Sequence, residues 1–401
     1  MEDGRMTWGL AQSSMPVTRR LPRKPAASQP SMPLSRRLPR NAAPQSSMPR
    51  TRLLPRKPAA SHSSMPLTHR LPRKRAARSL AALAAVTALA AACQPSPGAG
   101  GTDSTTSENI PGWQWTDEQV LETVNAVRAG RSLQPESWPG GARVAVLLSF
   151  DVDNETVLGL RYGDATVGSL SQGQFGARVA LPRVVDLLDR EGIPASFFIP
   201  AVSLVLDPSQ IDIIQAAGHH EFAIHGWIHE LNSSLEADVE RALLQRAVDY
   251  MTEVTGTRPL GYRAPSWNFS PNTLGILLEM GFLYDSSLMA DDRPYEINAH
   301  GDPTGMIELP VEWILDDAPL FNPLGTRYSP PRDVLQVWKD EFDGAYAEGT
   351  MFLLTMHPHV IGHRSRIVVL DELIQYIKGH EDVWFGTHLE AAQWVKEQAG
   401  M

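Results

Sequence analysis

The stretch Arg143–Glu155, RVAVLLSFDVDNE, joins an apolar run to two closely spaced carboxylates. The run is almost continuously apolar and of strand length, which is typical of a central strand that helices cover on both faces. Asp151 and Asp153 therefore stand at the carboxyl end of this strand, where catalytic groups collect in α/β folds. Because side chains of an extended chain alternate, both carboxylates should point the same way, so that one can bind a metal while the other acts as a base.

Two histidines follow a second predicted strand. His225 and His229 come after the short apolar segment Glu221–Ile224. They are four residues apart, so a helical turn or a tight loop would bring both imidazoles to one ion. Two imidazoles and one carboxylate leave coordination positions open, as a catalytic metal requires. An Asp-x-Asp pair alone is often a solvated turn and a His-x3-His pair a surface feature, but both at successive strand ends indicate a metal site.

Three further clusters continue this pattern downstream. Arg263, in GYRAPSW, follows a short predicted strand, where its guanidinium could pair with a carboxylate and hold it ionised. Trp313 ends the predicted strand MIELPVEW and could form a wall of a pocket. His357 follows the apolar strand FLLTM and could serve as a general acid.

The ordered motifs SFDVDNE, HGWIHE, GYRAPSW, ELPVEW and LTMHPH resemble the five motifs of the polysaccharide deacetylases, carbohydrate esterase family 4, which share the NodB-type homology domain. The resemblance covers about Arg143 to Val395. Within this family, the sequence is similar to one branch, which contains peptidoglycan-deacetylase-like proteins and also amidohydrolases acting on cyclic imides and allantoin. The resemblance implies a divalent metal cofactor, with zinc expected and cobalt or nickel as alternatives.

The resemblance also implies a role for each motif residue. Asp151 would be the catalytic base, with Arg263 orienting it and a metal-bound water as the nucleophile. His357 would be the general acid that protonates the departing amine. The metal ligands would be Asp153, His225 and His229.

Substrate contacts are expected from three further residues. Trp313 would line the acyl pocket, Tyr262 would contact the substrate, and backbone N–H groups near Ser266 would stabilise the oxyanion. The sequence departs from the usual family pattern at two places. Glu312 precedes Trp313 and is assigned no catalytic role, and His363-Arg364 stands where relatives of this branch more often have arginine followed by proline.

Other histidines are expected to have lesser roles. His219 and His220 follow Ala-Ala-Gly at a predicted helix-to-strand turn, where capping or packing is the usual use of such residues. His359 lies two residues beyond His357, so it could share the same face and support the site indirectly.

Beyond Arg143 the chain alternates predicted strands with amphipathic helices. Repeated βα units with chemistry at strand ends favour a barrel, and the family resemblance implies an α/β fold with a distorted or incomplete (β/α) barrel over residues 143–401. A helix with a capping-box pattern is expected from Thr116 to about Ala129, within an N-terminal helical extension at 113–142. The barrel helices are expected at 177–190, 209–217, 236–255, 272–280, 332–347 and 365–378.

The first part of the chain differs in composition from the rest. Pro/Arg-rich repeats of 16 to 17 residues fill residues 1–64, and such repeats cannot bury a core. Residues 65–92 have a basic start, an apolar stretch and small residues before Cys93, which is typical of a lipoprotein signal peptide. Residues 93–112 are expected to form a flexible tether. Because signal peptides begin near the initiator methionine, we expect translation to start at Met65.

The alternatives at the N-terminus are a basic tail that binds nucleic acid or anionic lipid, and ordinary secretion with cleavage near Ala92. Charge separates the two parts of the chain, with 17 Lys+Arg against 2 Asp+Glu before Cys93, and 19 against 43 in the remainder. This acidity argues against nucleic-acid binding by the mature domain. The single cysteine excludes a disulfide framework and a cysteine-based zinc site.

Three functions are compatible with these features. The expected one is hydrolysis of amide bonds in an N-acetylated envelope polysaccharide, such as peptidoglycan or a chitin-like glycan, by an exported, lipid-anchored enzyme of the cell envelope. The second is a cyclic imide or allantoin-type amidohydrolase that acts on a small amide, and the third is a non-catalytic carbohydrate-binding barrel. The motifs leave the glycan, the metal and the oligomeric state open, and a homo-oligomer is compatible with them.

Overall fold

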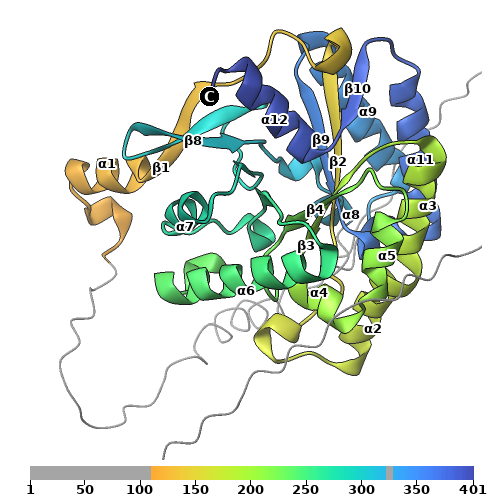
Figure 1. Cartoon of the computed structure of the whole chain (residues 1–401), viewed down its shortest axis with the longest axis horizontal. Coiled ribbons are helices and arrows are strands. Elements are labelled where there is room, and N and C mark those ends of the chain that lie inside the picture. Colours follow the sequence, from red (N-terminus) through yellow and green to blue (C-terminus); the bar gives the residue numbers. More distant parts are fainter. Residues whose placement is uncertain (1–109, 322–327) are drawn as a thin grey trace, which may run out of the picture. The chain divides into compact units, whose positions relative to one another are not determined.

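A single mixed sheet organises the computed structural model, which describes residues 110–321 and 328–401 (Figure 1). The strands run in the order β1-β7-β8-β6-β5-β4-β3-β2-β10, and β9 pairs with β2. The strands are β1 (Val127–Ser132), β2 (Val144–Asp151), β3 (Ser196–Ile199), β4 (Glu221–Ile224), β5 (Gly261–Tyr262), β6 (Tyr284–Asp285), β7 (Tyr295–Ala299), β8 (Asp302–Glu308), β9 (Met351–Met356) and β10 (Val383–Gly386).

The sheet forms an incomplete barrel, as expected. The strands from β2 through β6 to β8 pair in parallel, as do β2 with β9 and β2 with β10, whereas β1 and β7 form an antiparallel edge. In the described part of the chain, β9 meets the segment after β8 through one isolated bridge between Asp316 and Thr355. Every residue of β2 is buried, in agreement with its apolar sequence. Because these strands run parallel, the carboxyl end of β2 lies at the same rim of the sheet as the carboxyl ends of β4, β5 and β9.

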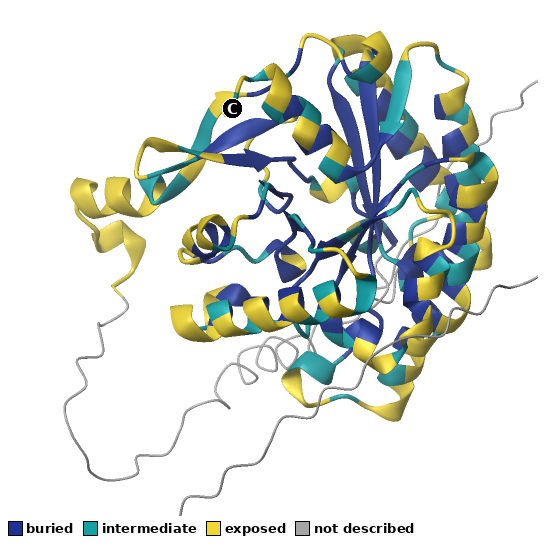
Figure 2. Ribbon diagram, viewed as in Figure 1, coloured by how far each residue is buried: buried dark blue, intermediate teal, exposed yellow. Residues whose placement is uncertain are grey.

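The helices fill the connections between the strands. They are α1 (Asp117–Asn125), α2 (Val167–Phe175), α3 (Leu181–Glu191), α4 (Ala201–Leu206), α5 (Ser209–Gln215), α6 (Ala237–Thr255), α7 (Thr273–Met280), α8 (Asp317–Phe321), α9 (Pro331–Glu348), α10 (Pro358–Ile361), α11 (Arg364–Lys378) and α12 (His388–Gln398). The six predicted barrel helices are present. The first of them begins with a π-helical turn, Gly176–Ala180, and continues as α3. In Figure 2 these helices turn exposed faces outward and buried faces toward the sheet.

The N-terminal extension differs from the prediction. The capping box at Thr116 is present, since its side chain accepts a hydrogen bond from the backbone N–H of Gln119. However, α1 ends at Asn125, and the following residues form edge strand β1, which pairs with β7. No residue of α1 is buried, so tertiary packing does not stabilise a longer helix. The backbone N–H and C=O groups of the following residues form hydrogen bonds with β7 instead. The extension is therefore part of the main sheet.

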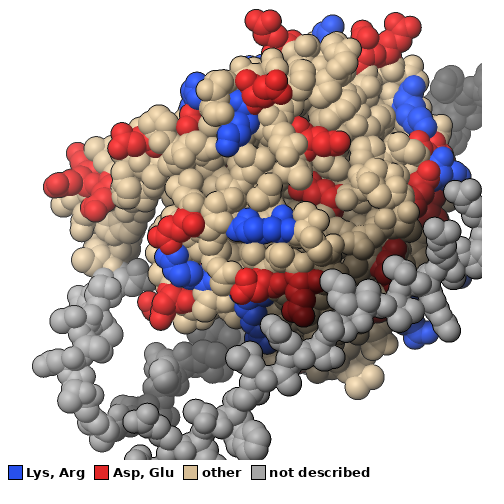
Figure 3. Space-filling view, viewed as in Figure 1, with Lys and Arg blue, Asp and Glu red and all other residues tan. Residues whose placement is uncertain are grey.

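The predicted repeats, the signal peptide, Cys93 and nearly all of the tether lie outside the described residues. Within the described part, no helix is long and apolar enough to cross a membrane. On the face seen in Figure 3, basic side chains are interspersed with acidic ones and form no continuous basic band.

Candidate metal and catalytic centre

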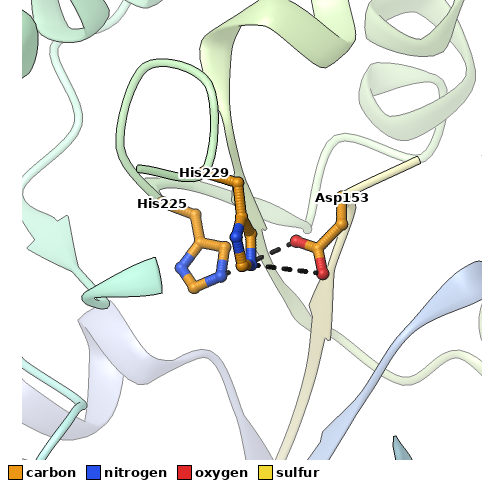
Figure 4. Close-up of side chains that lie close together, drawn as sticks. All are labelled: Asp153, His225 and His229. Carbon is orange, nitrogen blue, oxygen red and sulfur yellow. Dashed lines mark ion pairs between the residues drawn. The ribbon is translucent and has the colours of Figure 1, made fainter. Parts of the chain in front are cut away.

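Asp153, His225 and His229 come together at the ends of β2 and β4 (Figure 4). One ligand atom from each residue lies within 4.8 Å of the other two. His225 Nε2 is 3.6 Å from Asp153 Oδ1, and His229 Nε2 is 3.5 Å from Asp153 Oδ2. All three side chains are buried. The structure thus brings together the three residues that the sequence suggested as metal ligands.

The loop after β4 owes its shape to local features of HGWIHE. Gly226 has φ +76°, and a Cβ there would lie 2.8 Å from Pro265, so this position requires glycine. The Glu230 carboxylate accepts hydrogen bonds from the backbone N–H groups of Trp227 and Ile228, which closes the loop. His229 adopts φ +63°, a strained conformation for a residue with a side chain. The tight loop predicted from the four-residue spacing is therefore present.

The donor set fits a divalent metal. His225 Nδ1 donates a hydrogen bond to the carbonyl oxygen of Arg263 at 2.8 Å, which leaves the Nε2 lone pair facing Asp153. Burial lowers the pKa of His225 to about 4, so the imidazole is neutral at pH 7. Burial also raises the pKa of Asp153 to about 8, and its Oδ1 has no hydrogen-bond partner among the described residues. A cation would satisfy this atom and keep the carboxylate ionised.

Arg161 contacts the second imidazole and was not anticipated from the sequence. Its Nη1 lies 2.7 Å from His229 Nδ1 and 3.2 Å from Ser266 Oγ. It also donates to the carbonyl oxygen of His229 at 3.3 Å. Burial, together with the charges of His225 and Arg161, holds the pKa of His229 well below its usual value. No motif contains Arg161, so nothing in the local sequence distinguishes it from a surface arginine.

Asp151 forms a buried ion pair with Arg263. Arg263 Nη1 donates to Asp151 Oδ1 at 2.7 Å and also to Ser149 Oγ, while the rest of the guanidinium is held by Ser286. Burial alone would raise the pKa of Asp151, but the charges of Arg263, His225 and His357 outweigh it and lower the pKa below its usual value. Asp151 is thus ionised, and its Oδ2 lies 3.6 Å from His225 Nε2.

His357 stands on the other side of the same centre. Its Nδ1 lies 2.7 Å from Asp317 Oδ1, and its backbone N–H donates to Asp317 Oδ2. Burial would lower the pKa of His357, but the carboxylates of Asp317, Asp316 and Asp153 raise it well above its usual value. Its Nε2 is 3.7 Å from Asp153 Oδ2 and so faces the cluster. The consecutive residues Asp316 and Asp317, shortly after ELPVEW, were the only local sign of these partners, and no role was predicted for them.

These groups line one small cavity of about 170 Å³. Its walls include Asp151, Asp153, both ligand histidines, Ser266, Asp316 and His357. Trp313 is half-exposed at this cavity and packs on Trp267 with ring centroids 4.1 Å apart. Trp313 and Ser266, from which substrate contacts are expected, both line this cavity. A volume of this size suits a small acyl group.

The expectation for Tyr262 was wrong. Its side chain is buried in the main hydrophobic core, and its hydroxyl accepts a hydrogen bond from the amide of Asn232. The side chain before Arg263 in strand β5 points away from the rim, because successive residues in a strand alternate between faces. Arg263 occupies the side that faces the centre, which leaves Tyr262 on the core side.

A second Asp/His/His cluster has the wrong hydrogen-bonding pattern for a metal. Asp189, His219 and His220 also lie within 4.8 Å of one another. However, His220 Nδ1 accepts a hydrogen bond from the backbone N–H of Ala195, and Nε2 lies 3.1 Å from Asp189. Both nitrogens of His220 are therefore engaged within the protein. The predicted packing role of this histidine pair agrees with these contacts.

Comparisons with known proteins agree with the motifs. The family model described as polysaccharide deacetylase matches residues 170–284. A peptidoglycan deacetylase of Helicobacter pylori is 32% identical over 279 residues, covering 62% of this chain and 95% of the relative. The structure of a polysaccharide deacetylase homologue from Mycobacterium smegmatis has 36% identity and a TM-score of 0.63, covering 68% of this chain and 96% of the other. The structure of PuuE allantoinase has 28% identity and a TM-score of 0.59, and the match covers 65% of this chain and 92% of the allantoinase chain. Together with the fold, these similarities show that the chain belongs to the polysaccharide deacetylase family of enzymes.

Proposed function

We propose that this enzyme is a metal-dependent hydrolase that removes N-acetyl groups from an envelope glycan, either peptidoglycan or a chitin-like polymer of N-acetylglucosamine. The observation that carries the proposal is the arrangement of the cavity, where a cluster of metal-ligand type lies between an ionised carboxylate and a protonated imidazole. The peptidoglycan deacetylase of Helicobacter pylori, 32% identical, supports this choice of substrate.

Asp153, His225 and His229 would hold the metal, most simply zinc, with cobalt or nickel as alternatives. When bound there, a divalent metal would polarise the amide carbonyl and lower the pKa of a coordinated water. Three protein ligands leave room for both. Because Asp153 is buried and its Oδ1 has no other partner among the described residues, a bound metal would also compensate an otherwise unfavourable buried charge.

The remaining residues would handle protons and position the substrate. Asp151, kept ionised by Arg263, would accept the proton of the attacking water. His357, kept protonated by Asp317, would donate a proton to the nitrogen that leaves as an amine. The backbone N–H at Ser266 would donate to the developing oxyanion, and Trp313 would pack on the acyl methyl group.

Acetate release from a panel of substrates tests the proposal. Purified metal-loaded protein would be incubated with peptidoglycan, with chitooligosaccharides, and with cyclic imides and allantoin. We expect acetate from one of the two glycans and no ring opening of the small amides. Ring opening without acetate would overturn the glycan assignment.

The similarity to PuuE allantoinase supports one second candidate, an amidohydrolase of cyclic imides or allantoin. The catalytic cavity of about 170 Å³ could also take a small ring. Asp151 and His357 would then act as base and acid in the opening of a cyclic amide, and the amine would remain attached to the product. The assay above separates the two, because only deacetylation releases acetate.

Replacing Asp317 by asparagine should change the pH dependence of the reaction. The Asp317 carboxylate raises the pKa of His357, so its loss lowers that pKa, and His357 becomes deprotonated at a lower pH. The alkaline limb of the kcat/KM profile should therefore move to lower pH. Asp316→Asn is the matched control, since Asp316 lies 3.7 Å rather than 2.7 Å from His357 Nδ1 and should move the limb less. An alkaline limb that both variants leave in place would show that His357 is not the acid.

We further propose that Cys93 is lipidated and that residues 93–112 tether the catalytic domain, residues 143–401 with the extension 113–142, to a membrane of the envelope. The small-residue run before Cys93 supports this proposal. Several acyl chains, as bacterial lipoproteins carry, would bind a membrane firmly, whereas one chain binds marginally.

Replacing Cys93 by serine should block lipid attachment and release the protein from the membrane fraction. Mass spectrometry of the mature N-terminus in the native host provides the measurement. An unmodified N-terminus at or beyond Cys93 in the unchanged protein would refute the anchor. Peptides from residues 1–64 would refute the proposed start at Met65 without affecting the catalytic assignment.

A further inference from the structure

A second and larger cavity lies beside the catalytic cavity. It has a volume of about 590 Å³, within the usual range for ligand pockets, and is named here the Arg366 cavity. Its walls include Leu158, Phe175, Tyr328, His359, His363 and Arg366. Two pairs of neighbouring residues show that the cavities are adjacent, because each pair has one member in the wall of each cavity. The rings of His357, in the catalytic cavity, and His359, in the Arg366 cavity, are 5.7 Å apart, and the consecutive residues Val157 and Leu158 line one cavity each.

The lining of the Arg366 cavity is suited to an anion. Among the residues that the structure describes, the walls contain one arginine, two histidines, hydroxyl groups and an amide, but no aspartate or glutamate. This is unusual for a chain with 45 acidic residues against 36 basic ones. By contrast, the catalytic cavity contains three aspartates. An anionic group would therefore be attracted to the larger cavity and repelled by the carboxylates of the smaller one.

Arg366 is held in place by two contacts, and within the described part of the chain several of its guanidinium N–H groups remain free to bind a ligand. Its Nη1 donates to the carbonyl oxygen of Val360 at 2.9 Å, and its guanidinium lies 4.4 Å from the ring centroid of Phe321. Within the described residues it forms no ion pair. Asp317 is close enough to act on it electrostatically, but both oxygens of Asp317 already accept hydrogen bonds from His357. A guanidinium with N–H groups left over is a good partner for a carboxylate.

Two further features point into the same cavity. Arg366 lies in the first turn of the fifteen-residue helix α11, whose N-cap residue His363 makes no side-chain capping bond, so the positive end of the helix is available to an anion. His359 Nδ1 is buried and has no hydrogen-bond partner among the described residues. A buried polar atom of this kind normally has a partner, and at the wall of a cavity a ligand can supply it. The stacked rings of Phe175 and His363, 4.5 Å apart, add a flat surface for a sugar.

We propose that the Arg366 cavity binds the carboxylate-bearing part of an N-acylated amino sugar whose acyl group occupies the catalytic cavity. The corresponding ligand class is an N-acetylhexosamine that carries a carboxylate ether, as N-acetylmuramic acid does. A neutral chitin-like unit would leave His359 Nδ1 and the remaining N–H groups of Arg366 without a charged partner. The inference rests on the proposed function and narrows its substrate to the carboxylate-bearing glycan.

Binding and turnover of three disaccharides test this inference separately. The ligands are N-acetylglucosaminyl-N-acetylmuramic acid, its methyl ester and N,N′-diacetylchitobiose, which differ in the carboxylate or in the whole ether. Calorimetric titration uses the full-length, metal-loaded Asp151→Asn variant, which should bind without turnover. We expect the acid to bind at least about tenfold more tightly than the ester, as a charge-assisted hydrogen bond predicts.

Arg366→Gln in the same background should reduce the affinity ratio of acid to ester to about one, because the charged partner of the carboxylate is lost. Arg364→Gln is the matched control, since Arg364 is exposed and lies outside the cavity lining, and it should keep the ratio. Thermal unfolding of both variants checks that each is folded. A parent protein without preference for the acid, or a ratio that survives Arg366→Gln, would overturn the inference.

Acetate release by the unchanged enzyme from the same disaccharides separates this inference from the proposed function. Release at equal efficiency from all three would support deacetylation and refute the role of the Arg366 cavity. No release from any of them, combined with an acid preference that depends on Arg366, would refute glycan deacetylation for these compounds while supporting the binding site.

Discussion

Asp151→Asn is expected to lower kcat by about a hundredfold or more, because the variant loses its general base. The metal should remain bound, since Asp153, His225 and His229 are unchanged. The asparagine oxygen can still accept a hydrogen bond from Arg263, but the ion pair of 2.7 Å is lost, so some loss of thermal stability is also expected. Steady-state kinetics and metal analysis on the same preparation provide the measurement.

Asp153→Asn is the matched comparison for this variant. The two aspartates are two residues apart and equally buried, but only Asp153 lies within ligand distance of both histidines. Asp153→Asn should therefore lose metal and activity together, whereas Asp151→Asn should lose activity and keep its metal. Turnover at the wild-type rate in Asp151→Asn would show that another group is the base.

His225→Ala and His229→Ala should each remove the metal and abolish activity together. Each variant loses one of three protein ligands, and the remaining histidine and carboxylate cannot hold a divalent ion with comparable affinity. Metal content by mass spectrometry should fall from about one ion per chain toward zero. Full occupancy in either variant would contradict the assignment of the ligands.

His219→Ala provides the control for nonspecific effects of losing a histidine. His219 belongs to the other Asp/His/His cluster, which lies away from the catalytic cavity and includes a histidine with both nitrogens engaged. Metal content and turnover should remain at wild-type levels in this variant. A metal content that falls by one ion in His219→Ala would show that the second cluster also binds metal.

Much of the fold could be predicted because its signals are local. The apolar run of β2 and the amphipathic pattern of helices such as α6 and α9 identify the alternating βα units, and their carboxyl ends identify the rim. The prediction failed where local and long-range preferences compete. Residues after Asn125 join a strand 163 or more residues away rather than continue a helix, and nothing in their own sequence indicates that partner.

The order of the five motifs also indicated which side chains would meet, because parallel strands place their carboxyl ends at one rim. It did not indicate on which side of β5 the residues Tyr262 and Arg263 would lie. That choice depends on register, since a shift of one residue exchanges the two faces of a strand. Arg263 faces the centre because Asp151, 112 residues earlier, is there to pair with it.

By itself, the sequence determined which residues are candidates for metal ligands, base and acid, because their types and spacing at strand ends are chemical signatures that need no partner to be recognised. Only the tertiary structure decided what surrounds them. Arg161 reaches His229 across 68 residues, and Asp317 reaches His357 across 40. The Arg366 cavity likewise joins segments around residues 158–175 and 328–366. Such contacts depend on how the chain packs, and the energies that select them are summed over the whole fold rather than encoded in any one segment.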